Sequence, residues 1–284
     1  MSHDAILSPF LLAKDTHPDP DPNYRTLKYE PRLHLIPSYS DQPFDEPETP
    51  AELEEIRKVL YRVQHPTFVT IDRKAPLCHP FVPDADKEEV AGLLAKCAST
   101  KTPEALFPPQ RNRNTIVALR YIHARDSGVL LLQTDGACLN NGQAGPRAGA
   151  AFVFGPPNPR RPTETGVCAM SLDSADATNN RAELIAVIMA LRARIWWGEG
   201  FHTIVVATDS EYVVKGCTER CRNWEARGWK TSNRQPVKNR DLWEELIWGI
   251  EFIRHHGCEF EHVGVFEHDD TPQLVTVVGL EATL

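Results

Sequence analysis

The sequence of 284 residues lacks any apolar run close to the roughly 20 residues that cross a bilayer. It also lacks a secretory signal, because the early apolar run at residues 5–13 has no basic flank and contains Pro9. Its seven cysteines include no Cys-x-x-Cys pair, and their odd number favours reduced thiols over a disulfide framework. These absences predict an intracellular protein, cytoplasmic or nuclear, with no membrane partner.

An overall positive charge is also missing. The formal net charge is -8, which excludes a protein that coats nucleic acid with a generally basic surface. Any nucleic-acid site must therefore be a local basic patch. Cys217 and Cys221 are four residues apart and could share a helix face, but a zinc site there would need ligands that the sequence does not indicate.

Proline is abundant but unevenly spread, with most of the 23 prolines in the first 110 or so residues. Residues 1–50 combine proline with many acidic side chains, a composition that resists forming a packed core. Short helices are expected at residues 51–63 and 87–97. We therefore predict two parts: residues 1–114 as a Pro-rich, partly disordered extension with short helices, and residues 115–284 as the main domain.

From residue 115 onward the sequence alternates between strand-like and helix-like patterns. Strands are expected at residues 129–135, 147–154, 164–172, 202–208 and 258–266, and helices at residues 178–197, 210–216, 220–227 and 239–256. The first three strands are joined by turn signals, so they predict an antiparallel meander. The order strand-strand-strand-helix-strand-helix-helix-helix-strand predicts an α/β domain with a mixed five-stranded sheet and helices on both faces.

Three acidic residues stand at the junctions of these elements. Asp135 and Asp209 each close an apolar strand, and Glu183 opens the long helix. Each has a local explanation, because Asp-Gly is a turn dipeptide, Glu183 suits a helix cap, and Asp209 could be an N-cap. If the two strands are neighbours, however, all three carboxylates meet at one sheet edge and repel each other unless a cation is bound. Ligands that are all oxygen favour Mg²⁺, with Mn²⁺ as a substitute.

The sequence around these residues resembles a type 1 ribonuclease H domain over residues 129–265. The motifs that carry the resemblance lie at residues 134–138, 178–184, 208–213, 223–231 and 236–243. The resemblance implies a ribonuclease H-like fold and cleavage of the RNA strand of RNA/DNA hybrids to 5′-phosphate and 3′-hydroxyl ends. It also implies two Mg²⁺ ions held by four carboxylates, three of them Asp135, Glu183 and Asp209, with Asp135 bridging both ions.

Positive charge is concentrated in residues 220–240, which hold seven basic residues and one acidic residue. By itself this could be a solvated helix-turn with packing tryptophans. The resemblance implies instead a clamp on the phosphates of the DNA strand, together with a groove that contacts the hybrid. The predicted substrate-binding residues are Asn141, Asn179, Asn180, Glu211, Asn223, Trp224, Arg227, Trp229, Lys230, Thr231 and Lys238. Glu211 stands where the family often has glutamine.

The resemblance fails at the C-terminal end. The family continues with a His-bearing loop and a fourth Asp at the start of a closing helix, whereas residues 266–284 lack the loop glycines and the Ala-rich helix. Asp269, or its neighbour Asp270, is the nearest candidate for the fourth metal ligand. The sequence therefore leaves two functions open. The protein is either an active ribonuclease H or a catalytically impaired ribonuclease H-like module, which lacks the fourth carboxylate and binds nucleic acid or a partner.

Overall fold

The computed structural model describes residues 57, 61, 72, 75–81, 106–112, 119–156, 166–172 and 175–263. Arg57 and Tyr61 are helical, as expected for residues 51–63. The remainder of that helix, the helix expected at residues 87–97 and the segment after Val263 lie outside the described residues. The described residues thus comprise most of the domain from residue 119 onward and parts of the N-terminal region.

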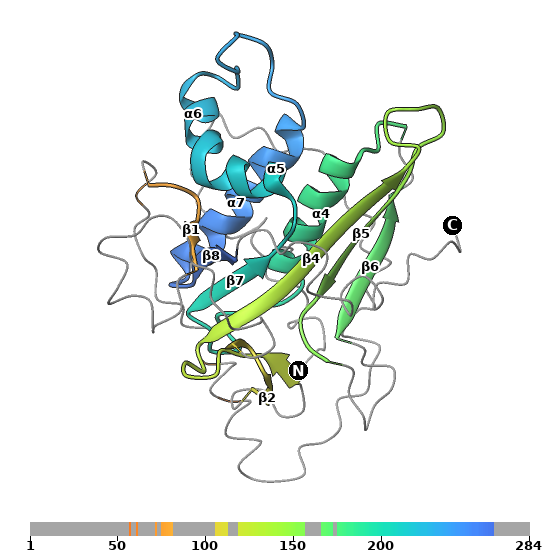
Figure 1. The fold of residues 1–284 in the computed structure, drawn as a ribbon. Helices are drawn as coiled ribbons and strands as arrows, with labels where there is room; N and C mark the ends of the chain where they lie inside the picture. The colour runs from red at the N-terminus through yellow and green to blue at the C-terminus, as the bar shows by residue number, and fades with distance from the viewer. Residues whose placement is uncertain are drawn as a thin grey trace.

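A six-stranded mixed sheet organises the domain (Figure 1). Its spatial order is β1 (His79–Pro80), β8 (Glu259–Val263), β7 (Thr203–Ala207), β4 (Val129–Leu139), β5 (Arg147–Val153) and β6 (Val167–Leu172). The five strands predicted from the sequence are all present, and the meander of β4, β5 and β6 is antiparallel as expected. The sixth strand, β1, has two residues, which is too short for any periodicity to reveal it.

The centre of the sheet is parallel. Strand β7 pairs in parallel with β4 on one side and with β8 on the other, so it holds the buried central position that its β-branched sequence predicts. Strand β4 is longer than predicted and runs on to Leu139, because its second half pairs with β5. The last pair between β4 and β7 is Gln133 with Ala207, so the residues that follow these two positions leave the pairing at the same edge of the sheet.

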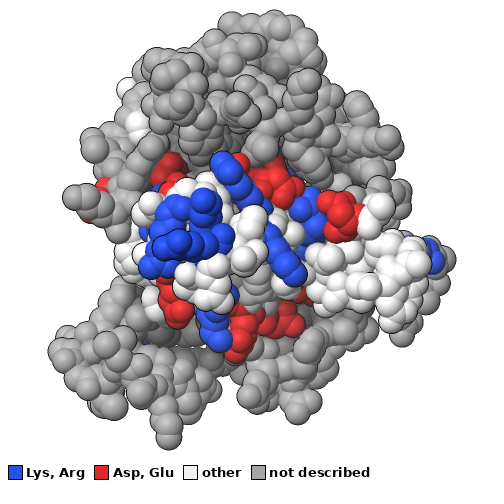
Figure 2. All heavy atoms as spheres, turned by 90° about the horizontal axis from the view of Figure 1, so that it is seen from above, with Lys and Arg blue, Asp and Glu red and all other residues white. Residues whose placement is uncertain are grey.

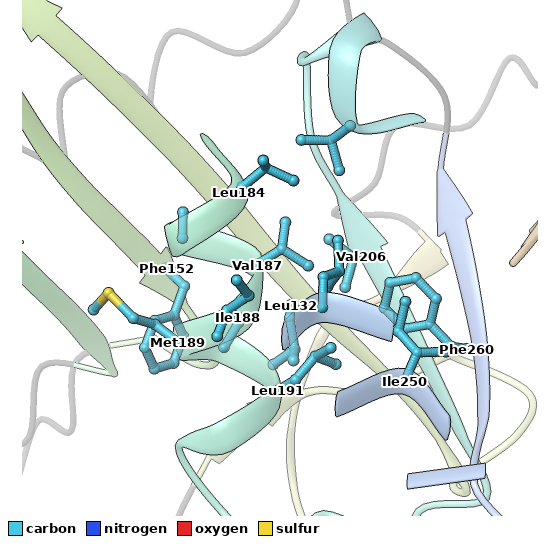
Figure 3. Packing of buried hydrophobic residues seen from close by; sticks show 14 of the residues in the cluster. Leu132, Phe152, Leu184, Val187, Ile188, Met189, Leu191, Val206, Ile250 and Phe260 are labelled. Atoms are coloured by element: carbon cyan, nitrogen blue, oxygen red, sulfur yellow. The ribbon is translucent and has the colours of Figure 1, made fainter. Parts of the chain in front are cut away.

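Two long helices cover one face of this sheet. They are α4 (Asn179–Arg192) and α7 (Arg240–His255), with α5 (Glu211–Lys215), a π-helical turn (Gly216–Arg220) and α6 (Cys221–Ala226) between them in the chain. Figure 3 shows Val187 and Leu191 of α4 and Ile250 of α7 packed over Leu132 and Val206 of the sheet. Residues 182–191 of α4 are all buried, because the helix contacts the sheet on one side and α7 on the other.

The opposite face of the sheet carries a second, smaller core. Strand residues alternate between the two faces, so Val129, Leu131 and Val205 point away from α4 and α7. The described residues that cover them are Phe81, Leu106, Phe107 and Tyr121, which come from the region before residue 122. Helices were expected on both faces. The helices whose bounds the structure gives are α4 to α7, and the described residues that pack on this second face come from the N-terminal region.

A two-stranded ribbon, β2 (Pro109–Arg111) and β3 (Leu119–Tyr121), joins this cover to the domain. Arg120 of β3 donates to both carboxylate oxygens of Glu199, at 3.1 and 3.3 Å, and Asn112 donates to the Glu199 backbone carbonyl. Burial raises the pKa of Glu199, but the charges of Arg120 and Arg194 outweigh burial and hold it below its ordinary value. This buried ion pair fixes the ribbon against the loop that follows α4.

The described cysteines carry free thiols. Cys217 and Cys221 are buried. A hydrogen bond with Cys78 is the main cause, and burial the second, of a pKa of Cys217 that lies well above its ordinary value. Within the described ranges, no group of three metal-ligating side chains includes a cysteine, so the structure gives no support there for a zinc site. No helix in the described part of the chain is long and apolar enough to cross a bilayer.

Candidate active site

The three acidic residues singled out in the sequence meet at one edge of the sheet. One oxygen each from Asp135, Glu183 and Asp209 lies within 4.8 Å of the other two. Glu183 is buried, and the two aspartates are half-buried. Such a cluster can hold a divalent cation, since close carboxylates without a counter-charge repel each other strongly.

The parallel pairing of β4 and β7 places the two aspartates. Asp135 stands two residues beyond the last β4–β7 pair, and Asp209 stands two residues beyond it on the other strand. Asp135 lies inside β4 rather than in a turn, so the turn explanation for Asp-Gly is wrong. Asp209 is not the cap of α5 either, because Ser210 accepts the capping hydrogen bond from the Val213 amide.

Helix α4 brings Glu183 to the same edge. Thr178 is its N-cap and accepts from the Arg181 amide, so Glu183 is free of the capping role that its position suggests. Gly136 makes the approach possible, because a Cβ at this position would lie 2.3 Å from the Glu183 backbone nitrogen. The Gly136 amide also hydrogen-bonds to the Glu183 carboxylate. The glycine after Asp135 is therefore needed where helix and strand backbones touch.

Electrostatics at the cluster favour a cation. Burial first, and then the charges of Asp209 and Asp135, raise the pKa of Glu183 to about 8. One carboxylate oxygen of Glu183, Oε2, is buried without a hydrogen-bond partner. A buried, unsatisfied oxygen that faces two more carboxylates fits a divalent metal ion, which would supply both the missing ligand bond and the missing positive charge.

A basic loop, residues 227–238, rises beside this edge between α6 and α7 (Figure 1). Its side chains line a hollow of about 570 Å³ formed by Arg227, Lys230, Thr231, Ser232 and Arg234. Figure 2 looks onto this end of the molecule, where Lys and Arg side chains gather with acidic residues among them. With a net charge of -8, a nucleic-acid site would have to be a local basic patch, and this loop is such a patch.

The basic loop is held in shape by its own hydrogen bonds. The Val237 amide donates to the Trp229 carbonyl, and the Thr231 amide donates to the Gln235 carbonyl. Trp229 and Arg234 both take the left-handed backbone conformation, with φ of 61°. The loop is therefore a tight hairpin-like turn whose basic side chains are exposed.

Two predicted groove residues lie at the start of α4, and a third lies in the loop after β4. Asn179 and Asn180 are exposed in the first turn of the helix, and Asn141 is exposed in that loop. The Asn179 side-chain oxygen accepts from the Cys138 amide at 2.7 Å, while the Asn141 side-chain oxygen accepts from the Asn179 amide at 3.4 Å. These contacts tie the N-terminus of α4 to the end of β4, next to the carboxylates, and leave polar groups at the surface.

The remaining predicted residues divide between surface and packing positions. Arg227, Lys230 and Lys238 are exposed, and Thr231 is half-buried in the basic loop. Asn223 is exposed but donates to the Glu219 carbonyl. Glu211 is exposed and pairs with Lys215 at 2.7 Å, and this hydrogen bond with the lysine lowers the pKa of Glu211. The structure thus gives Glu211 a cationic neighbour at the position where the family often has glutamine.

Trp224, just before the basic loop, and Trp229, within it, are both partly buried against the core. The Trp224 ring meets the Trp243 ring at 5.5 Å between centroids, and the Trp229 ring lies under the Arg240 guanidinium at 5.5 Å.

Tyr212 and Gly136 were not predicted as site residues from the sequence, although both lie inside the motifs that carry the resemblance. Asp269 lies outside the described residues, so its role as a fourth ligand stays a prediction.

Comparison with known proteins gives the same domain. The ribonuclease H family model matches residues 128–270, half of the chain. A Ribonuclease H of Treponema pallidum is 43% identical over 123 residues, which cover 41% of this chain and 70% of that protein. A Ribonuclease HI of Pseudomonas aeruginosa is 40% identical over 139 residues, covering 49% and 82%. The crystal structure of a type 1 RNase H with the type 2 active-site motif is 29% identical, covers 50% of this chain and 64% of that one, and superposes with a TM-score of 0.36.

Fold and site together define an α/β nuclease domain with an acidic cluster that could bind metal. The chain belongs to the ribonuclease H family, and its domain is of the type 1 kind. The predicted resemblance over residues 129–265 is confirmed by a family match that begins one residue earlier and ends five residues later.

Proposed function

We propose that this protein is a metal-dependent endoribonuclease that hydrolyses the RNA strand of RNA/DNA hybrids, leaving 5′-phosphate and 3′-hydroxyl ends. The observation that carries the proposal is the convergence of Asp135, Glu183 and Asp209 within 4.8 Å, in a chain that belongs to the ribonuclease H family. The substrate class is supported by the curated relatives, which are named Ribonuclease H.

Asp135, Glu183 and Asp209 would hold Mg²⁺, with Mn²⁺ as a substitute, since all their donors are carboxylate oxygens. Such ions favour ionisation of the attacking water and stabilise negative charge on the leaving 3′-oxygen. The chain itself positions these ligands through β4, β7 and α4. Asp269 is the candidate for a fourth ligand.

The basic loop would hold the DNA strand. Arg227, Lys230 and Lys238 are exposed cations on a tight turn, and such side chains bind phosphates without regard to sequence. On the other side of the carboxylates, Asn141, Asn179 and Asn180 offer polar groups that can recognise 2′-hydroxyls, the feature that distinguishes RNA from DNA. The scissile RNA phosphate would lie between the two sets, over the acidic cluster.

The test is cleavage of an RNA/DNA hybrid labelled on either strand, in Mg²⁺ and in Mn²⁺, by the full chain and by Asp135→Asn. We expect RNA-strand cleavage by the wild type and a loss of at least about a hundredfold in Asp135→Asn, because one of the ligands that stabilise the transition state is gone. Single-stranded RNA, double-stranded RNA and double-stranded DNA of the same sequence are the substrate controls. Circular dichroism shows whether the variant keeps its fold.

Two results would contradict the proposal. Cleavage that survives in Asp135→Asn would come from a contaminating nuclease or another site. Salt-sensitive hybrid binding without cleavage by the wild type, in either metal, would point to the alternative of a binding module whose catalytic centre lacks its fourth carboxylate.

A further inference from the structure

The Tyr212 hydroxyl joins three residues that are more than 25 positions away in the sequence. It accepts hydrogen bonds from Trp243 Nε1 at 3.0 Å and from Asn239 Nδ2 at 3.2 Å. It donates to the backbone carbonyl of Lys238 at 3.3 Å. A phenol hydroxyl has one proton to donate and two lone pairs that accept, so these three contacts use its full capacity.

Tyr212 stands on the element that begins at the acidic cluster. Asp209 is followed by the cap Ser210, and Tyr212 is the second residue of α5. Its ring packs against the Trp243 ring at 5.3 Å between centroids. Trp243 in turn lies against Gly216, where an added Cβ would come within 1.9 Å of the indole. The turn that carries Asp209 is therefore fixed against the first two turns of α7.

The partners of the hydroxyl are the exit of the basic loop. Lys238 is exposed at the end of the loop, and the residue after it, Asn239, takes the left-handed conformation with φ of 57°. The Asn239 side chain makes no capping bond to α7, and its Nδ2 donates to the Tyr212 hydroxyl. Backbone hydrogen bonds across the loop connect its two sides, so the way its ends are held decides how the loop as a whole is oriented.

We propose that Tyr212 is a positioning residue whose hydroxyl sets the orientation of the basic loop relative to the acidic cluster. The inference rests on the proposed function, in which the loop holds the DNA strand while the carboxylates act on the RNA strand. The hybrid is a stiff duplex, so the distance between loop and cluster decides whether both can be engaged at once. The hydroxyl connects α5, which begins two residues after Asp209, to the Lys238 backbone through a hydrogen bond of 3.3 Å.

The test uses Tyr212→Phe in the full chain, because phenylalanine keeps the ring packing on Trp243 and removes only the hydroxyl. We expect KM for the hybrid to rise about five- to tenfold, the equivalent of roughly one net hydrogen bond, with kcat changed less than about twofold. Binding is measured separately by fluorescence anisotropy in the Asp135→Asn background, where the expected rise in Kd is the same. Hydrogen exchange at the Val237 amide of the basic loop should become faster.

Two further variants make the experiment decisive. Asn239→Gly tolerates the left-handed backbone and removes one of the three contacts, so it should raise KM less, and Tyr212→Phe/Asn239→Gly should add little to Tyr212→Phe. Tyr121→Phe, which removes a hydroxyl on β3 beneath the other sheet face, is the matched control and should leave KM unchanged.

The outcomes separate this inference from the proposed function. If the wild type cleaves the hybrid and Tyr212→Phe lowers the melting temperature while KM, Kd and loop exchange stay unchanged, the hydroxyl is only structural and the inference is wrong. A fall in kcat at unchanged KM would also overturn it. A wild type that neither cleaves nor binds the hybrid would overturn the proposed function, and the positioning role would fall with it.

Discussion

Glu183 is the residue whose environment differs most from that of a free side chain among the three carboxylates. Its pKa rises from an ordinary 4.5 to about 8, because burial and two neighbouring aspartates disfavour the ionised form. Between these two values the folded protein keeps a proton that the unfolded chain releases. Without metal, the contribution of Glu183 to stability is therefore complete below about pH 4.5 and is lost as the pH rises through 8.

This sign gives a prediction for Glu183→Gln. A pKa change from 4.5 to about 8 is worth roughly 4 to 5 kcal/mol, so the metal-free wild type should lose stability between pH 5 and 8 while the variant loses less. At pH 8 in EDTA we expect the variant to be more stable by about 2 to 4 kcal/mol. Urea unfolding at several pH values measures this.

Glu219→Gln, on the exposed side of the π-helical turn, is the control and should follow the wild type. Adding Mg²⁺ at pH 8 should stabilise the wild type more than Glu183→Gln, because the variant keeps only two of the three carboxylates that would hold the ion. A wild type whose stability is flat from pH 5 to 8 in EDTA would show that Glu183 is already ionised in the metal-free fold.

The residue scale also shows why the sequence alone left each acidic residue open. Asp135-Gly136 has the composition of a turn, yet Gly136 is there because the α4 backbone touches β4. Asp209 precedes a helix and has the residue type of an N-cap, yet the N-cap is Ser210. Local rules suggest a role for each side chain, and only the approach of α4 and β7 to the same end of β4 shows that these roles are taken by others.

At the scale of elements, the short strand β1 covers what would otherwise be the edge strand of the sheet. It pairs in parallel with β8, and the residues just before it are buried, Leu77 and Cys78 at 0 and 2% exposure. Arg222 of α6 donates to the Ala75 carbonyl and Arg254 of α7 donates to the Pro76 carbonyl. An edge strand with open hydrogen-bonding groups invites aggregation, and this segment blocks it.

We predict that Leu77→Ala destabilises the domain by about 2 to 4 kcal/mol, the range for removing a fully buried leucine from a core. The adjacent exposed His79→Ala should change the free energy of unfolding by less than about 0.5 kcal/mol. Chemical unfolding of both variants measures the difference. Equal stability of Leu77→Ala and wild type would mean that the segment before β1 does not contribute to the folded core.

At the scale of the whole molecule, the division into an extension of residues 1–114 and a domain of residues 115–284 stays a prediction. Phe81 and Phe107, which lie before that boundary, pack on the second face of the sheet. Their rings meet at 5.4 Å, and both contact the His123 ring. The core under them includes strand residues that would otherwise be exposed to water.

We therefore expect a chain that begins at residue 115 to be less stable than one that begins at residue 72. Loss of Phe107 alone should remove about 3 to 5 kcal/mol, the range for a buried phenylalanine, and loss of Leu77 adds to this. The measurement is the melting temperature and the soluble yield of the two chains, each checked for hybrid cleavage. If both chains melt at the same temperature, residues 1–114 form a separate extension as the sequence suggests.

The sequence by itself determined the α/β order of elements, the three acidic residues and the concentration of basic residues between 220 and 240. These depend on local periodicity and on the chemistry of side chains, both of which a sequence records directly. Tertiary structure decided that Asp135, Glu183 and Asp209 converge, that the N-terminal region covers the second sheet face, and that Tyr212 links the Asp209 turn to the basic loop. Those facts depend on contacts between residues 25 to 150 positions apart, and no local pattern encodes which distant partners will meet.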